Sequence, residues 1–107
     1  MIRGSIWWVE FDPAVGTEIQ KTRPAVIVSN DLANKYLDRV VVITLTGNVS
    51  RVYPGEAIVT VNGKKNKAMT DQIMSADKSR IKNKIAVLSD SDMHSVEMAM
   101  KRFFSFS

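Results

Sequence analysis

The stretch EAIVTVNGKKNKAM, residues 56–69, decides the fold class of this chain. Its first six residues alternate with period two, which is typical of a half-buried β-strand. Asn62-Gly63 follows at once and readily supplies the two positive φ angles of a type I′ turn. The residues KKNKAM then return as a second strand, so we predict an antiparallel hairpin here.

Four more segments are predicted to be strands. Residues 5–11 (SIWWVEF) and 39–46 (RVVVITLT) are rich in aromatic or β-branched residues. Residues 24–30 (PAVIVSN) are too apolar throughout to leave a water-facing side, and 84–89 (KIAVLS) form a later strand. The short polar passage at 31–36 is expected to form one helical turn.

The tail at 89–104 predicts a helix, because Ser89 can act as N-cap with Asp92 three residues on. One apolar stripe then follows helical spacing: Met93, Val96, Met100 and Phe103. We therefore expect a single domain over residues 1–107, mainly β, with a C-terminal helix packed across a small antiparallel barrel or strongly curled sheet.

The composition excludes several classes of protein. Without cysteine the chain has no disulfide, thiol nucleophile or thiolate metal site, which fits a reducing cytoplasm. No segment approaches the roughly 20 apolar residues of a membrane span, so we expect a soluble, cytoplasmic protein. We find no HExxH motif, Gly-rich phosphate loop or cluster with metal-ligand spacing, so neither a metal nor another cofactor is expected.

The net charge of +4 lies entirely in the second half of the chain. Residues 1–50 hold five Lys/Arg and five Asp/Glu, whereas residues 51–107 hold ten against six. Such an excess favours a polyanionic partner, although a solvated basic surface would look the same. The one histidine, His94, falls on the predicted helix, so an enzyme of this sequence would work without histidine and without a metal.

The stretch GTEIQKTRP, residues 16–24, holds the first candidate site residues. Pro24 biases Arg23 toward extended geometry and puts its guanidinium at the mouth of the second strand. The planar fork of donors on an arginine suits phosphate oxygens. Glu18 could accept a proton or could pair with Arg23, so a phosphate site and a loop salt bridge both stay open.

Three further candidates follow. Thr46 supplies a hydroxyl at the end of the third strand, although threonine is common in strands. Asp71 and Gln72 add a carboxylate and an amide after the hairpin. An amide can hydrogen-bond to a base edge or can equally cap a turn, so these residue types alone do not decide.

In their order along nearly the entire chain, these motifs resemble those of the MazF/PemK (Kid-like) toxins of bacterial type II toxin–antitoxin modules. The resemblance is carried by RG-x-IW from Arg3, by DP-x-x-GTE with RP five residues after the glutamate, and by PAVIVSND, VVVITLTG, DQI-x-x-x-DKSRI and LSD before the helix. It implies an SH3-like (CcdB/PemK-type) barrel, usually paired as a homodimer.

The resemblance also implies an activity and partners. Such toxins are endoribonucleases that cut single-stranded RNA, often mRNA at short sequences, without a metal. A cognate antitoxin blocks the site through an acidic tail, and promoter DNA is bound only in complex with that antitoxin. The implied reaction is attack of a ribose 2′-OH on the adjacent phosphate, which gives a 2′,3′-cyclic phosphate and a 5′-OH.

Carried over by position, the resemblance makes Arg23 and Thr46 the catalytic arginine and threonine, with Glu18 as the loop glutamate. Asp71 and Gln72 match a pair that holds RNA, and either Glu18 or Asp71 is the general base. The same loop makes two further residues candidates for RNA binding: Thr17 and Gln20.

Two departures favour the MazF-like over the Kid-like assignment: Met69 stands where Kid-like members place a basic residue, and Thr17 where they have histidine. Met74 departs from the MazF pattern itself, since many MazF members have arginine there, so the recognised RNA sequence and the rate stay open. Two other functions stay open. One is a gyrase poison of the CcdB kind, which the C-terminal residues FFSFS do not match, and the other is a non-catalytic RNA-binding barrel.

Overall fold

The computed structural model describes residues 1–11 and 22–107. The elements in chain order are β1 (Ser5–Glu10), β2 (Thr22–Ile27), α1 (Asp31–Tyr36), β3 (Arg39–Thr46), β4 (Glu56–Val61), β5 (Lys64–Met69), the 3-10 turn η1 (Thr70–Gln72), β6 (Met74–Asp77), the 3-10 turn η2 (Lys78–Arg80), β7 (Ile81–Val87) and α2 (Asp90–Phe104).

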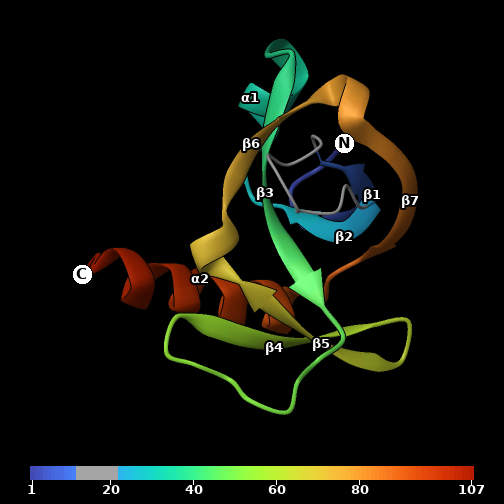
Figure 1. Ribbon diagram of the computed structural model, residues 1–107. Helices are drawn as coiled ribbons and strands as arrows, with labels where there is room; N and C mark the ends of the chain where they lie inside the picture. Colours follow the sequence, from blue (N-terminus) through green and yellow to red (C-terminus); the bar gives the residue numbers. More distant parts are fainter. Residues whose placement is uncertain (12–21) are drawn as a thin grey trace, which may run out of the picture.

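The strands form one curled antiparallel sheet with α2 packed against it (Figure 1). Its order is β4-β5-β3-β2-β1-β7, and β6 pairs separately with β3. Strand β3 is therefore central, since it pairs with β2, β5 and β6. The expected mainly β, curled barrel-like architecture with a C-terminal helix is confirmed.

The hairpin of β4 and β5 forms as its turn chemistry predicts. The register runs from Glu56 opposite Met69 to Val61 opposite Lys64. Asn62 and Gly63 have φ angles of 49° and 79°, the left-handed values that a type I′ turn requires. Local sequence thus fixes this pairing.

The second predicted strand is displaced toward the N-terminus. Strand β2 begins at Thr22 opposite Glu10, and it ends at Ile27. The predicted residues 28–30 leave the strand because Asn30 caps α1, where its side chain accepts a hydrogen bond from the Ala33 N–H at 2.8 Å. The expected helical turn at 31–36 is confirmed.

The chain between the hairpin and the last strand carries elements that the sequence did not indicate. Strand β6 is only four residues long and exists by pairing with β3. The turn η2 follows it, and hydrogen bonds from the Ser79 side chain and backbone hold the pKa of Asp77 below its ordinary value. Strand β7 covers Ile81–Val87 rather than 84–89, because Ser89 is the N-cap of α2.

The apolar residues form two clusters, one on each side of the curl. The first lies between the sheet and α2, and its members include Ile6, Val26, Ile43, Leu45, Val59, Val96 and Ala99. The second lies on the opposite face of the sheet and comprises Val9, Ala25, Ile27, Val40, Val42, Ala76 and Ile81, with Trp7 and Phe11 packed against it. Full burial of one valine or isoleucine side chain stabilises the folded state by about 1.5–3 kcal/mol, so both clusters stabilise the curled sheet.

Helix α2 begins as predicted, and its apolar stripe is buried along only part of its length. The Ser89 hydroxyl accepts from the Asp92 N–H at 3.1 Å, and Met93 and Val96 are buried. Met100 packs against the same cluster, whereas Phe103 is 46% exposed. Its side chain lies against Gly55 rather than inside the core. Among the described helices, none is long and apolar enough to cross a membrane.

Candidate functional site

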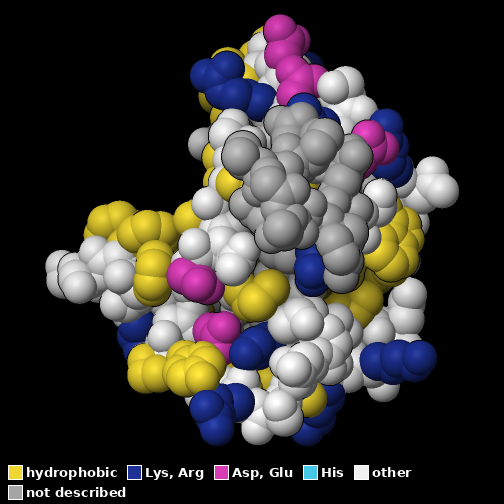
Figure 2. Space-filling view, in the orientation of Figure 1, with side chains coloured by type: hydrophobic (Ala, Val, Ile, Leu, Met, Phe, Trp, Pro, Cys, Tyr) yellow, Lys and Arg dark blue, Asp and Glu magenta, His cyan; other side chains and the backbone are white. Residues whose placement is uncertain are grey.

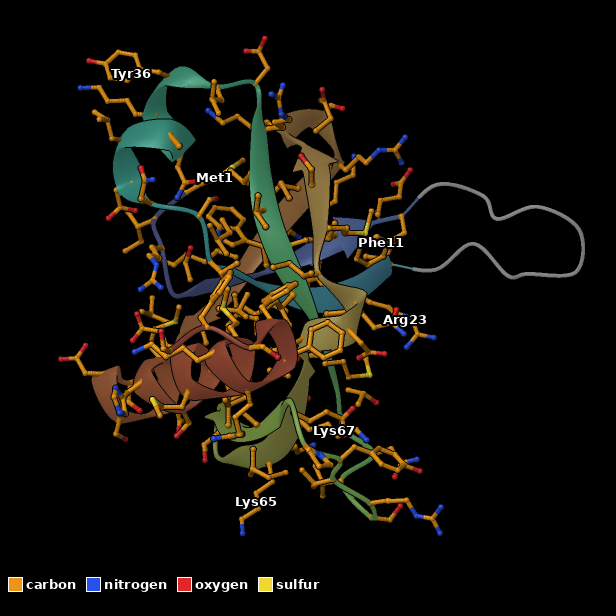
Figure 3. All side chains as sticks on the ribbon, turned by 90° about the vertical axis from the view of Figure 1, so that its left-hand side faces the viewer. Met1, Phe11, Arg23, Tyr36, Lys65 and Lys67 are labelled. Carbon is orange, nitrogen blue, oxygen red and sulfur yellow. The ribbon has the colours of Figure 1, made fainter. Side chains whose placement is uncertain are left out.

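Arg23 is the second residue of β2, so it stands at the start of this strand, as predicted from Pro24, but already within its paired part. It pairs with Val9 in the ladder between β1 and β2, because β2 begins before Pro24. Its side chain is half-buried and has no hydrogen bond or ion pair with another described residue. Figure 3 shows it pointing away from the barrel. The guanidinium is thus held on a paired strand, and no other described residue binds its donors.

Thr46 is the last residue of β3 and pairs with Lys67 across β5. On the other edge of β3, Ala25 pairs with Thr44, and continuing that antiparallel register by two residues puts Arg23 across from Thr46. The Thr46 hydroxyl is partly exposed and accepts a hydrogen bond from the Asn48 N–H at 3.3 Å. The two candidates therefore belong to the same end of the β2–β3 pair.

Asp71 and Gln72 are exposed residues of the turn η1. This turn joins β5 to β6, and both of these strands pair with β3 on the edge that faces away from β2. Strand β3 thus lies between Arg23 on one side and η1 on the other. The structure places all four described candidates around the C-terminal half of β3.

A cavity of about 220 Å³ opens beside Asp71. It is lined by Tyr53, Pro54, Gly55, Glu56, Thr70, Asp71 and Phe103. The Thr70 hydroxyl, which is buried, donates to the Gly55 carbonyl and ties η1 to the chain before β4. The cavity walls therefore come from the β3–β4 connection, η1 and the end of α2.

The charged side chains are mixed on the face that carries these elements. Figure 2 shows Lys and Arg side chains beside Asp and Glu, with hydrophobic side chains between them. The excess positive charge of the second half of the chain is thus not gathered into one uniform patch on this face.

Residues 2–104 match the family model described as PemK-like, MazF-like toxin of type II toxin-antitoxin system. The chain belongs to this family. It is 36% identical over 110 residues to a protein named Endoribonuclease MazF9 from Mycobacterium tuberculosis, a match that covers 94% of this chain and 93% of the relative. The predicted membership of the MazF/PemK toxins is confirmed.

Solved structures of MazF proteins share the fold. A mycobacterial endoribonuclease in complex with its cognate antitoxin has a TM-score of 0.82 at 18% identity, covering 100% of this chain and 97% of the other. MazF from Deinococcus radiodurans has a TM-score of 0.81 at 21% identity, covering 99% and 97%. A MazE–MazF structure from the same organism has a TM-score of 0.82 at 22% identity, covering 100% and 97%.

Three candidate site residues of this MazF-like toxin lie outside the described residues: Thr17, Glu18 and Gln20. Whether Glu18 pairs with Arg23 or acts as a base stays a prediction. Within residues 1–11 and 22–107, no group of three or more His, Cys, Asp and Glu could hold a metal ion. His94 lies on α2, as predicted, and is exposed.

Sequence reasoning missed the residues that surround Asp71 and Thr46. Tyr53 and Phe103 line the cavity, and Glu56 pairs with Lys67 at 3.2 Å. The hairpin register contained a signal for this pair, since it puts Lys67 opposite Ile58 and therefore diagonal to Glu56. No pattern in the sequence pointed to the two aromatic residues.

Proposed function

We propose that this MazF-like toxin is an endoribonuclease that cleaves single-stranded RNA, with a preference for particular short sequences and without a metal. The name of its relative, an endoribonuclease 36% identical over nearly the full length, supports the class of reaction. The observation that carries the proposal is Arg23 near the start of β2, whose guanidinium points away from the barrel and has no partner among the described residues.

The proposed reaction needs the groups that flank β3. A ribose 2′-oxygen bonds to the adjacent phosphorus as its proton passes to Glu18 or Asp71. The bond from phosphorus to the 5′-oxygen breaks, that oxygen takes up a proton, and a 2′,3′-cyclic phosphate and a 5′-OH end result. Arg23 and Thr46 donate hydrogen bonds to the phosphate oxygens, where negative charge builds up in the transition state. Thr17, Gln20, Asp71 and Gln72 bind the RNA.

We further propose that residues 1–107 act as one toxin domain in the cytoplasm and pair as a homodimer. A cognate antitoxin occludes the site with an acidic tail, and promoter DNA is bound only in that complex. The solved toxin–antitoxin structures with the same fold support a protein partner of this kind. The guanidinium of Arg23 would suit a carboxylate as well as a phosphate.

The test is cleavage of a long, varied, end-labelled single-stranded RNA in the presence of EDTA, with the Arg23→Ala variant as control. We expect cuts at preferred sequences that carry cyclic phosphate ends and disappear with the variant. The matching DNA, which lacks the 2′-OH, should survive. Absence of cleavage by the wild type would contradict the proposal and favour an RNA-binding barrel or a gyrase-directed toxin.

An RNA-binding barrel would stack bases on exposed aromatic side chains. Of the aromatic residues in the first predicted strand, only Trp8 is strongly exposed, at 42%.

A further inference from the structure

Lys67 is a buried cation, and its ammonium group lies beside a carboxylate, a backbone carbonyl and an aromatic ring. The side chains of Lys67 and Glu56 are 11% and 10% exposed, and their charged atoms lie 3.2 Å apart. The Lys67 ammonium also donates to the Arg51 carbonyl at 2.8 Å and lies 5.6 Å from the centroid of the Tyr53 ring. Since an unpaired buried ammonium is costly, this arrangement fixes its partners in place.

Those partners belong to the connection between β3 and β4. Glu56, besides binding Lys67, accepts a hydrogen bond from the Tyr53 N–H at 2.8 Å. Lys67 holds the carbonyl of Arg51 from the other side. The ion pair therefore anchors the second half of residues 47–55 to the hairpin.

The first half of the same connection is bonded to Thr46. The Asn48 N–H donates to the Thr46 hydroxyl oxygen, and the Asn48 side chain accepts from the Ser50 hydroxyl at 2.8 Å. Ser50 immediately precedes Arg51, whose carbonyl binds Lys67. A series of local contacts thus runs from the Thr46 hydroxyl to the buried ion pair.

Thr46 and Lys67 are also direct cross-strand neighbours, so their side chains stand on the same face of the β3–β5 pair. Because the Thr46 oxygen already accepts from Asn48, its own proton is left to donate to a ligand. The orientation of this donor depends on where Asn48 is held.

We propose that Lys67 and Glu56 are positioning residues for RNA cleavage, which act by holding residues 47–55 so that the Thr46 hydroxyl points at the scissile phosphate. This inference rests on the proposed function, in which Thr46 stabilises charge in the transition state. Neither Lys67 nor Glu56 touches the reacting atoms. Their loss therefore lowers the rate at saturating RNA rather than the affinity for RNA.

The test compares Lys67→Met with Lys65→Met, a matched control on the same strand. Lys65 is exposed and extends away from the molecule, whereas Lys67 lies among other side chains (Figure 3). Both variants remove one positive charge. We measure the single-turnover cleavage rate at saturating RNA, and the Kd for RNA with a 2′-deoxy group at the cleavage site.

We expect Lys67→Met to slow cleavage about tenfold, a typical coupling between neighbouring groups, and to shift the Kd no more than Lys65→Met does. Lys67→Arg keeps a cation that can reach the same acceptors and should restore part of the rate. In a Thr46→Val background, Lys67→Met should change the rate by less than about twofold, because the effect passes through Thr46.

Circular dichroism and thermal unfolding establish that each variant is folded. If Lys67→Met does not fold, Glu56→Gln serves instead, since its amide oxygen still accepts from Tyr53 while the charge is lost. A cleavage rate equal to that of Lys65→Met, or an equal slowing with and without Thr46, overturns the inference. In both cases the wild type still cuts and Arg23→Ala does not, so the proposed function stands. A wild type that does not cut overturns both.

Discussion

Two cations lie on either side of the end of β3, and their surroundings are opposite. Arg23 on β2 is half-buried, points away from the barrel and has no partner among the described residues. Lys67 on β5 is buried and bound to a carboxylate and a carbonyl. A cation is therefore available to a ligand only where the fold leaves its hydrogen-bond donors unsatisfied.

The same comparison separates two kinds of contribution to function. No described residue binds the donors of Arg23, so removal of this side chain should lower the activity and change the stability little. Lys67 has its donors satisfied inside the protein, so its removal should cost stability and reach the chemistry only through Thr46.

The first prediction concerns Arg23→Ala. We expect the single-turnover rate of RNA cleavage to fall about 10²–10³-fold, as when one donor to a developing oxyanion is lost. The free energy of unfolding, measured in urea, should change by less than about 0.5 kcal/mol, because no described contact is lost. Arg23→Lys keeps the charge but loses the planar fork, and should fall between wild type and alanine. A large loss of stability would show instead that Arg23 is a structural cation.

The second prediction concerns Lys67→Ala. This variant leaves the Glu56 carboxylate buried without its cation, which should lower the free energy of unfolding by about 3 kcal/mol. The control is Lys65→Ala, whose exposed side chain should matter by less than about 0.5 kcal/mol. Equal urea midpoints for the two variants would remove the distinction between a buried and an exposed lysine on this strand.

Much of the fold around these cations could be predicted from local sequence. The bounds of β3, β4 and β5 agree with the predicted ranges, because β-branched runs and the Asn62-Gly63 turn act over a few residues. Strand β6 could not be predicted. Its four residues, MSAD, have no strand pattern, and only pairing with β3 makes them a strand.

The candidate site was harder to predict than the fold. Arg23 could be singled out because of Pro24 and the motif around it, but its strand position depends on pairing with Val9. The cavity beside Asp71 could not be read from sequence, since its walls come from three separate segments of the chain. Such a site exists only after the sheet has curled and α2 has packed.

The third prediction concerns Gly55, which borders the cavity on the Lys67 side of β3. Its φ is +88°, and a Cβ would lie 3.2 Å from the Phe103 side chain. Gly55→Ala should therefore lower the free energy of unfolding by about 1–2 kcal/mol, because a side chain is strained at this φ. Gly47→Ala is the control, since a Cβ there meets nothing within 4 Å. If both substitutions had equal effects in urea, contact with Phe103 and backbone strain would not matter at Gly55.

The fourth and smallest effect is expected at the start of α2, far along the chain from either cation. The Ser89 hydroxyl accepts from the Asp92 N–H, and the Asp92 carboxylate in turn accepts from the Thr60 N–H of edge strand β4 at 2.8 Å. Ser89→Ala should cost about 1 kcal/mol of stability through the lost cap. The cleavage rate at a temperature where the variant stays folded should be unchanged, because the cap touches neither Arg23 nor the contacts of Lys67.

Ser91→Ala provides the matched control for that cap. Ser91 is an exposed serine in the first turn of the same helix. The one hydrogen bond described for its hydroxyl is with the Ser89 hydroxyl, at 3.4 Å, and either group could be the donor. We expect it to change the urea midpoint less than Ser89→Ala does. A slower cleavage rate in folded Ser89→Ala would mean that the position of α2 affects the site. The distinction between Arg23, which is available to a ligand, and Lys67, which is anchored, would then be incomplete, because the helix that lines the cavity would also contribute to function.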